Sequence, residues 1–303
     1  MKNPIIFGPV ASRRFGISLG IDLSPDKKQC NFDCLYCELD KAKTMSEMTD
    51  YPSVNEIIEQ VKQTFLKNKK IDVITLTANG EPTLYPHLNE LIDEINKIKG
   101  ETKTLILSNG STIYKEKTYN ALLKIDTVKL SLDCISKKCF KKLDRIDDEI
   151  AIERIVPAMV SFSKQTVNNF VIEILFVKTL NDKEEELKLL YDALEKINPH
   201  RVDIGTIDRP PAYKVQPVSY DFLEYVANYF KSINTNIVYK NRPKQLNSYS
   251  EAEILHTLKR RPMTVDDVEN MLDENSKDIL EKLVKSSKIK LVDSSGVKFY
   301  KNL

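Results

Sequence analysis

The chain has 303 residues, of which 46 are lysine or arginine and 44 are aspartate or glutamate, giving a formal net charge of +2. This length allows a sizeable core, in one large domain or in a large domain with a small one. A mean hydropathy of −0.35 and the lack of a long apolar run exclude a protein built from membrane-spanning helices, and the small charge argues neither for nor against a polyanionic partner.

The N-terminus and the cysteines predict where the protein resides. Residues 1–7 lack the apolar core and the small-residue cleavage site of a signal peptide. The five cysteines are odd in number and three are clustered, which does not suit a disulfide framework. We therefore expect a cytoplasmic protein without a membrane partner, whose thiols are available for metal.

Segments of strand type alternate with amphipathic helices over about residues 15–210. Ser53 and Glu56 form a capping box at the start of the first of these helices. The alternation is typical of βαβ units, which build a mostly parallel sheet with right-handed crossovers. Strands are expected at Ile17–Leu23, Ile71–Leu76, Lys103–Leu107, Thr127–Leu132, Phe170–Val177 and Arg201–Ile207.

This α/β pattern fits an open doubly wound sheet as well as a barrel. Six units are too few for the eightfold barrel. We therefore predict a partial (β/α)6 barrel of parallel strands.

The last fifty-odd residues predict three short helices and a hairpin. Helices are expected at Glu251–Leu258, after Thr264 and after Ser276, with the two hydroxyl residues as N-caps. The hairpin strands are expected at residues 288–292 and 297–300. Three helices followed by a hairpin predict a winged-helix domain.

We place the domain boundary in the polar passage at residues 241–248, which gives a catalytic domain at 1–242 and a winged-helix domain at 243–303. Counted from Ser248, the smaller domain has ten bases and ten acids, but its bases gather after Asp278. Its third helix and hairpin could therefore present a basic face to nucleic acid. A protein-docking or lid module is the alternative.

Cys30, Cys34 and Cys37 lie within eight positions, directly after the first expected strand. Their spacing lets three thiolates converge, and no fourth cysteine or histidine follows within the next forty residues. A structural zinc site is normally closed by four ligands, whereas closely spaced cysteines commonly hold iron–sulfur clusters. The loop therefore predicts a metal centre with one open position.

Other distinctive residues follow the later strands, namely Asn79-Gly80-Glu81-Pro82, Ser108-Asn109 and Asp133. Active sites of parallel sheets form at the carboxyl ends of the strands, so we expect these residues to face the cysteine loop. Gly80 would let the backbone approach a ligand closely, and Glu81 would accept an ammonium group. Asp133 could instead cap the next helix.

Two of these motifs together resemble the radical S-adenosylmethionine (SAM) superfamily. One is Cys30-x3-Cys34-x2-Cys37 with Tyr36 before the last cysteine; the other is the segment at 79–82, similar to that family's Gly-Gly-Glu-Pro. The resemblance implies that the three cysteines ligate a [4Fe-4S] cluster whose fourth iron binds SAM. The cluster, reduced by a donor such as flavodoxin or ferredoxin, would cleave SAM to a 5′-deoxyadenosyl radical that abstracts hydrogen from a substrate.

The same resemblance implies the contacts of SAM. Residues 79–82 would hold its methionine amino group, and Ser108 and Asn109 would contact its ribose or carboxylate. We also expect Tyr36 and Asp133 among the residues that bind the cofactor.

A narrower resemblance covers residues 8–22 together with 79–84. It is to a largely uncharacterised family related to the wyosine-tRNA synthases, which carry additional N-terminal cysteines that this chain lacks before Cys30. An RNA substrate is therefore one alternative, and a peptide or a small metabolite is another. A zinc-containing nucleic-acid-binding protein without catalysis is the alternative from a different class.

Cys134 and Cys139 stand apart from the clustered cysteines. They could line the cavity as a radical relay, as ligands of a second cluster or as a persulfide carrier. Two cysteines without further partners make a poor second cluster, so we favour small buried side chains.

Overall fold

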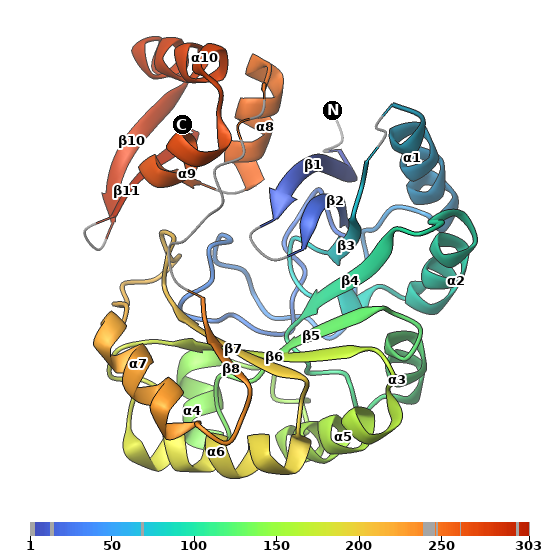
Figure 1. Ribbon diagram of the computed structural model, residues 1–303, viewed down its shortest axis with the longest axis vertical. Helices are drawn as coiled ribbons and strands as arrows, with labels where there is room; N and C mark the ends of the chain where they lie inside the picture. The colour runs from blue at the N-terminus through green and yellow to red at the C-terminus, as the bar shows by residue number, and fades with distance from the viewer. Residues whose placement is uncertain are drawn as a thin grey trace.

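Eight strands form one sheet in which the spatial order follows the chain order from β1 to β8 (Figure 1). β1 pairs antiparallel with β2, and every later pair is parallel. A computed structural model describes residues 4–12, 15–67, 70–238, 246, 248–260, 262–294 and 297–302. The strands span Ile6–Ser12 (β1), Gly16–Asp22 (β2), Val73–Thr77 (β3), Lys103–Ser108 (β4), Thr127–Ser131 (β5), Asn169–Phe176 (β6), Arg201–Thr206 (β7) and Thr235–Ile237 (β8).

Helices connect the parallel strands and lie along the convex outer side of the curved sheet (Figure 1). The α/β architecture expected of a partial barrel is confirmed. The connecting helical elements are α1 (Val54–Lys67), η1 (Pro82–Leu84), α2 (Leu88–Ile98), α3 (Glu116–Leu122), α4 (Lys137–Cys139), the π-helix η2 (Phe140–Asp144), α5 (Ile152–Gln165), α6 (Glu184–Ile197) and α7 (Tyr220–Tyr229).

The first helix shows how local sequence and packing agree. The Ser53 hydroxyl accepts from the amide of Glu56, and the Glu56 carboxylate accepts from the amide of Ser53, which confirms the capping box. Val54, Ile57 and Val61 repeat with helical periodicity and are buried against the sheet. Capping thus sets where α1 begins, and the apolar stripe sets which face it buries.

All six strands of the predicted alternation are present, and the sheet has two more, of which β8 overlaps an edge strand that the sequence also predicts from Asn236. β8 adds a short parallel edge, and β1 covers the edge of β2. The segment of β1 contains Gly8 and Pro9, which read as turn residues, and the strand register shifts between Phe7 and Val10. Proline is tolerated at edge strands and bulges, where no ladder hydrogen bond is lost.

A charged cluster lies within the sheet. Lys129 on β5 pairs with Glu173 on β6 and, at 3.2 Å, with Asp203 on β7. Side chains of Lys129 and Asp203 are 2% and 0% exposed, whereas that of Glu173 is 38% exposed. Arg201 also lies 2.9 Å from Asp203, so the charges of this cluster offset one another and the sheet can bury them.

The C-terminal part forms its own hydrophobic core, which includes Ile254, Leu280 and Leu283 among the buried side chains. Its elements agree with the expected three helices and hairpin, with one short strand added. They are α8 (Glu251–Arg260), β9 (Met263–Thr264), α9 (Val265–Met271), α10 (Glu274–Lys285), β10 (Ile289–Ser294) and β11 (Val297–Asn302).

One of the two predicted caps in this part is wrong. Thr264 and Asp267 form a capping box for α9, as expected of Thr264. The third helix, however, is capped by Asp273, whose carboxylate accepts from the amide and the hydroxyl of Ser276. An aspartate three residues earlier is the better acceptor for the free amides of the first turn.

The predicted domain boundary cannot be followed in the structure. Residues 239–245 and 247 lie outside the described residues, so the linker at 241–248 and the domains 1–242 and 243–303 stay predictions. Within the described part of the chain, no helix has the length and apolar character to cross a membrane.

Candidate active site

The loop after β2 carries the three clustered cysteines, all half-buried. Backbone hydrogen bonds hold it from several sides. The amide of Met45 donates to the Cys30 carbonyl at 2.9 Å, and the amide of Ala212 donates to the Cys37 carbonyl at 2.8 Å. The loop is therefore held by the chain that follows it, at Met45, and by the segment after β7, at Ala212.

Burial disfavours the charged forms of the three thiols. It raises the pKa of Cys30 to about 12, with Glu81 as the next cause. The pKa of Cys34 is raised by burial and by Asp144, and that of Cys37 by burial, against the opposing effect of Lys28. Each cysteine in this loop therefore needs a bound cation to become a thiolate at neutral pH.

The donor set fits a [4Fe-4S] cluster. The three cysteines lie on one loop, and charge on Cys37 raises the pKa of both Cys30 and Cys34. All five cysteines of the chain lie among the described residues, and only these three have free thiols. Three thiolates are what a cluster with one open iron requires.

Gly80 permits a close approach between two segments of the backbone. Its φ is +136°, and a Cβ at this position would lie 1.9 Å from the backbone oxygen of Gln29. Gln29 and Gly80 form a parallel bridge, flanked by bonds from the Gln29 amide to the Asn79 carbonyl and from the Glu81 amide to the Gln29 carbonyl. The close approach is thus to the strand-like start of the cysteine loop, which a side chain would push away.

Glu81 is 1% exposed and its carboxylate receives four hydrogen bonds. Oε1 accepts from the amide and hydroxyl of Thr83 and, at 2.7 Å, from the hydroxyl of Ser108, while Oε2 accepts at 2.7 Å from the amide of Asn109. Burial raises its pKa, and these four donors oppose the shift. In this arrangement Glu81 joins the ends of β3 and β4, so its oxygens are already satisfied by the protein.

Asn109 extends this network to the cysteine loop. Its side-chain amide donates to the side-chain oxygen Oδ1 of Asn31 at 2.9 Å and lies 3.8 Å from the Cys30 sulfur. Asn31 in turn donates to the hydroxyl of Ser111 at 2.8 Å. The predicted residues at 79–82 and 108–109 are therefore brought together with Cys30, with Asn109 adjacent to the sulfur.

Asp133 meets the cysteine loop at its other end. Tyr36 donates its hydroxyl proton to the Asp133 carboxylate, which also accepts from the Leu175 amide at 2.6 Å. Burial raises the pKa of Asp133 to about 7. The next helix is capped by Ser136, so the alternative of Asp133 as a helix cap is wrong.

Several residues of the site were missed by sequence reasoning. Asp33 is 6% exposed and accepts from the hydroxyl of Tyr213 at 2.5 Å, and Arg145 lies 3.3 Å from it. Arg209 pairs with Glu38 beside the loop. The only local signal was the turn-rich segment after β7, and its contact with the cysteine loop depends on the closure of the fold.

Cys134 and Cys139 are joined by a disulfide, which corrects the expectation that all thiols are free. Both are buried, as favoured, with 0% and 6% exposure. Their five-residue separation brings them together because a loop and a helical turn intervene.

A comparison with protein families matches residues 27–190, more than half of the chain, to the radical SAM superfamily. The chain belongs to the radical SAM superfamily. Radical SAM proteins use a [4Fe-4S] cluster and SAM, so the predicted enzyme class and both cofactors are confirmed. The alternative of a zinc-containing protein without catalysis is thereby removed, while the assignment of single residues to the cofactors stays a prediction.

The relatives of this radical SAM chain do not identify its substrate. A UPF0026 protein of Helicobacter pylori strain J99 is 43% identical over 301 residues, which are 98% of this chain and 97% of the relative. A radical SAM methyltransferase structure from Sphaerobacter thermophilus aligns with a TM-score of 0.56 and 14% identity, over 73% of this chain and 66% of that one. An archaeal TYW1 structure aligns over 98% of this chain and 81% of that one at 15% identity, but its TM-score of 0.44 is too low to argue from.

Proposed function

We propose that Cys30, Cys34 and Cys37 hold the cluster and that the strand ends beside them bind SAM for reductive cleavage. The observation that carries the proposal is the set of three free thiols on one loop, with the two remaining cysteines bonded to each other. When bound and reduced, the cluster supplies the electron that splits SAM into methionine and a 5′-deoxyadenosyl radical, which abstracts hydrogen from the substrate.

The protein's own groups orient the cofactor in this proposal. The segment 79–82 would hold the methionine amino group, through backbone oxygens because the Glu81 carboxylate is already satisfied. Asn109, next to Cys30, would contact the ribose or carboxylate of SAM, and Ser108 would support it through Glu81. Tyr36 and Asp133 would bound the site on the opposite side of the loop.

The test is reconstitution with iron and sulfide, followed by reduction with dithionite and chromatographic assay of 5′-deoxyadenosine. Wild-type protein should bind about four irons per chain and form 5′-deoxyadenosine. Cys34→Ser should lose both. The matched control Cys134→Ser/Cys139→Ser removes two cysteines outside the loop and should keep the full iron content; equal iron loss in both variants would contradict the ligand assignment.

We propose RNA as the substrate and a flavodoxin or ferredoxin as the electron donor. The support for RNA is a set of exposed lysines in the C-terminal part. Lys290 and Lys301 are opposite each other on β10 and β11, and Lys282 on α10 and Lys298 on β11 are also exposed. Phosphate backbones are bound by such lysines in a salt-dependent manner.

The RNA proposal is tested by fluorescence anisotropy with a labelled transfer RNA at two or more salt concentrations. Lys290→Glu/Lys301→Glu should weaken binding at least about tenfold and reduce the salt dependence by about two counterions. Lys62→Glu/Lys67→Glu on α1 makes the same charge change elsewhere and should have little effect. No binding by the wild type would leave a peptide or a small metabolite as the substrate.

A further inference from the structure

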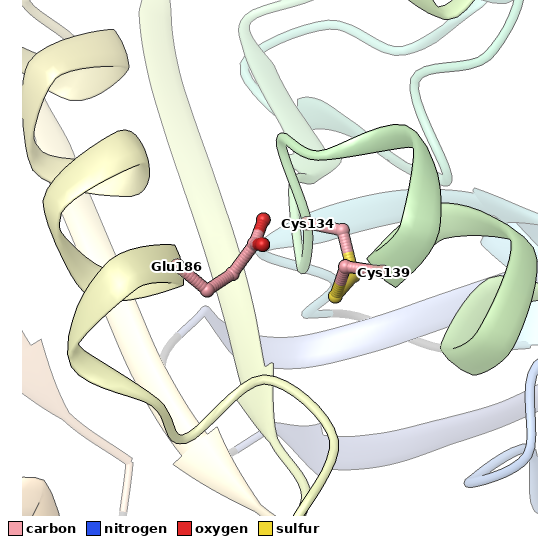
Figure 2. A group of neighbouring side chains, drawn as sticks. All are labelled: Cys134, Cys139 and Glu186. Atoms are coloured by element: carbon pink, nitrogen blue, oxygen red, sulfur yellow. A yellow bond between two sulfur atoms is a disulfide. The ribbon is translucent and has the colours of Figure 1, made fainter.

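The buried disulfide lies next to the cysteine loop without belonging to it. Cys134 follows β5 and Cys139 ends α4, with their Cα atoms 5.5 Å apart (Figure 2). Their sulfurs are enclosed by the protein. In this state the pair is shielded from a substrate, and its direct effect is on the two segments that it joins.

The first of these segments contacts the cysteine loop through Asp133. This residue directly precedes Cys134 and accepts the hydroxyl proton of Tyr36. It is held in place by the Leu175 amide and by Asn181, which donates to its backbone carbonyl at 3.0 Å. One end of the disulfide is therefore anchored to β6 and to residue 36 of the loop.

The second segment contacts the same loop through its backbone. The chain continues from Cys139 directly into η2, whose last two carbonyls face the loop. The amide of Leu35 donates to Leu143 at 2.9 Å, and the amide of Asp33 donates to Asp144 at 3.1 Å. The disulfide thus links the two structures that hold residues 33–36 between Cys30 and Cys37.

Glu186 on α6 binds the loop that connects the two cysteines. Its carboxylate points toward the pair (Figure 2) and accepts from the amides of Ile135 and Ser136, at 2.5 and 2.9 Å, and from the Ser136 hydroxyl at 2.7 Å. A carboxylate oxygen and the two sulfurs lie within 4.8 Å of one another. Two thiols held this way would stay close enough to form the bond again.

We propose that Cys134 and Cys139 are a reversible dithiol–disulfide couple whose closed form restrains residues 33–36 of the cysteine loop. Opening takes two electrons and two protons from a dithiol reductant, which leaves as its own disulfide, and closing is the reverse. Because the sulfurs are buried, exchange requires local opening of residues 134–144. Reduction removes the covalent link between the two anchoring segments and loosens their hold on the loop.

The test uses reconstituted wild-type protein, held without oxygen in buffers of different ratios of reduced to oxidised dithiothreitol. Alkylation and peptide mass mapping should show Cys134 and Cys139 converting together. Hydrogen exchange in the peptide 31–36 should be at least about tenfold slower in the closed form, because a disulfide disfavours opening of the segment that it closes. The peptide of α2, at residues 88–98, is the internal reference and should not change.

Single variants separate the couple from a general effect of the reductant. In Cys134→Ser and in Cys139→Ser, the peptide 31–36 should show the hydrogen-exchange rate of the reduced wild type at every ratio of reduced to oxidised dithiothreitol. Thiols that stay reduced at all ratios, or equal exchange of 31–36 in both forms, would overturn the proposal.

Metal binding is the competing account of these side chains. Zinc that binds one per chain to the reduced wild type, and is lost in Cys139→Ser, would assign the two thiolates and Glu186 to a metal site and would also overturn the proposal. If a variant does not fold, the titration of the wild-type protein with reduced and oxidised dithiothreitol is sufficient to test the proposal. None of these measurements uses SAM cleavage, so failure here is distinct from failure of the proposed function.

Discussion

Gly80 is required by a neighbouring backbone, and the consequence can be measured. A Cβ would lie 1.9 Å from the Gln29 oxygen, and φ is +136°. We expect Gly80→Ala to lower the free energy of unfolding by about 3 kcal/mol and to reduce the iron retained after reconstitution, since the cysteine loop must move. Denaturant titration and iron analysis check this.

Gly100→Ala is the matched control for this substitution. Gly100 also has a positive φ, +54°, but nothing lies within 4 Å of an added Cβ. Backbone strain alone should cost about 1 kcal/mol and leave iron binding intact. Equal losses in the two variants would show that the contact with Gln29 is not the cause.

For single residues, the sequence predicted the location of the site more accurately than the role of each side chain in it. Cys30, Glu81 and Asn109 were predicted to meet because each follows a strand of a parallel sheet. The acceptor role given to Glu81 overlooked Ser108 and Asn109, which approach it from the next strand. Such partners are fixed by strand register, which a local motif does not contain.

Among the elements, the strands β5, β6 and β7 are joined by the charged cluster around Lys129. We expect Lys129→Met to lower the free energy of unfolding by about 2–3 kcal/mol, because Asp203 loses a buried partner while Arg201 still pairs with it at 2.9 Å. The control Lys124→Met breaks a more exposed pair with Asp93 and should cost under about 1 kcal/mol. Denaturant titration of both variants would contradict this account if the costs were alike.

Asp126 joins the starts of β4 and β5 and gives a pH-dependent prediction. Burial alone would raise its pKa, but hydrogen bonds from Lys99 and Thr104 outweigh it, and the net pKa is lowered. An acid with a lowered folded-state pKa stabilises above its unfolded value near 3.9 and loses this as pH falls through the folded value. Asp126→Asn should therefore cost about 1–2 kcal/mol at pH 7, and the difference from wild type should shrink below about pH 4.

Thermal unfolding between pH 3 and 7 measures this difference. The control Asp93→Asn removes the exposed pair with Lys124 and should change stability by about 0.5 kcal/mol or less at neutral pH. A cost of Asp126→Asn that stayed constant over the whole range would sink the assignment.

Elements with a regular period were predictable, and irregular ones were not. The six predicted parallel strands, β2 to β7, are mostly buried and rich in apolar residues, which makes them recognisable in the sequence. β1 was missed because its Gly8 and Pro9 resemble a turn, and only pairing with β2 makes the segment a strand. The cap of α10 was misplaced because Asp273 and Ser276 are both good cap residues, and their choice depends on where the chain enters the helix.

For the whole molecule, two separate hydrophobic cores predict two separable responses to mutation. Leu280 belongs to the C-terminal core and Ile172 to the core of the large sheet. Replacing either residue by alanine should lower the free energy of unfolding by about 2–5 kcal/mol, but only for the part of the chain that contains that residue. Hydrogen exchange should accelerate in residues 248–302 for Leu280→Ala and in the sheet for Ile172→Ala.

Iron content and 5′-deoxyadenosine formation complete this comparison. Leu280→Ala should retain both, since no described residue of the cysteine loop belongs to the C-terminal core. Acceleration of exchange throughout the chain in Leu280→Ala would show that the two cores unfold as one unit.

Among the described strands, the two edge strands β1 and β8 are not hydrogen-bonded to each other. Loops, rather than a strand ladder, therefore lie between the two edges of the sheet. The segment after β7 reaches the cysteine loop through one backbone bond, from Ala212 to Cys37, and through the side chains of Tyr213 and Arg209. A molecule that enters there displaces a few contacts, whereas entry between two sheet neighbours would break a strand ladder. Opening the barrel beside the cysteine loop would therefore break fewer hydrogen bonds than opening it between two neighbouring strands.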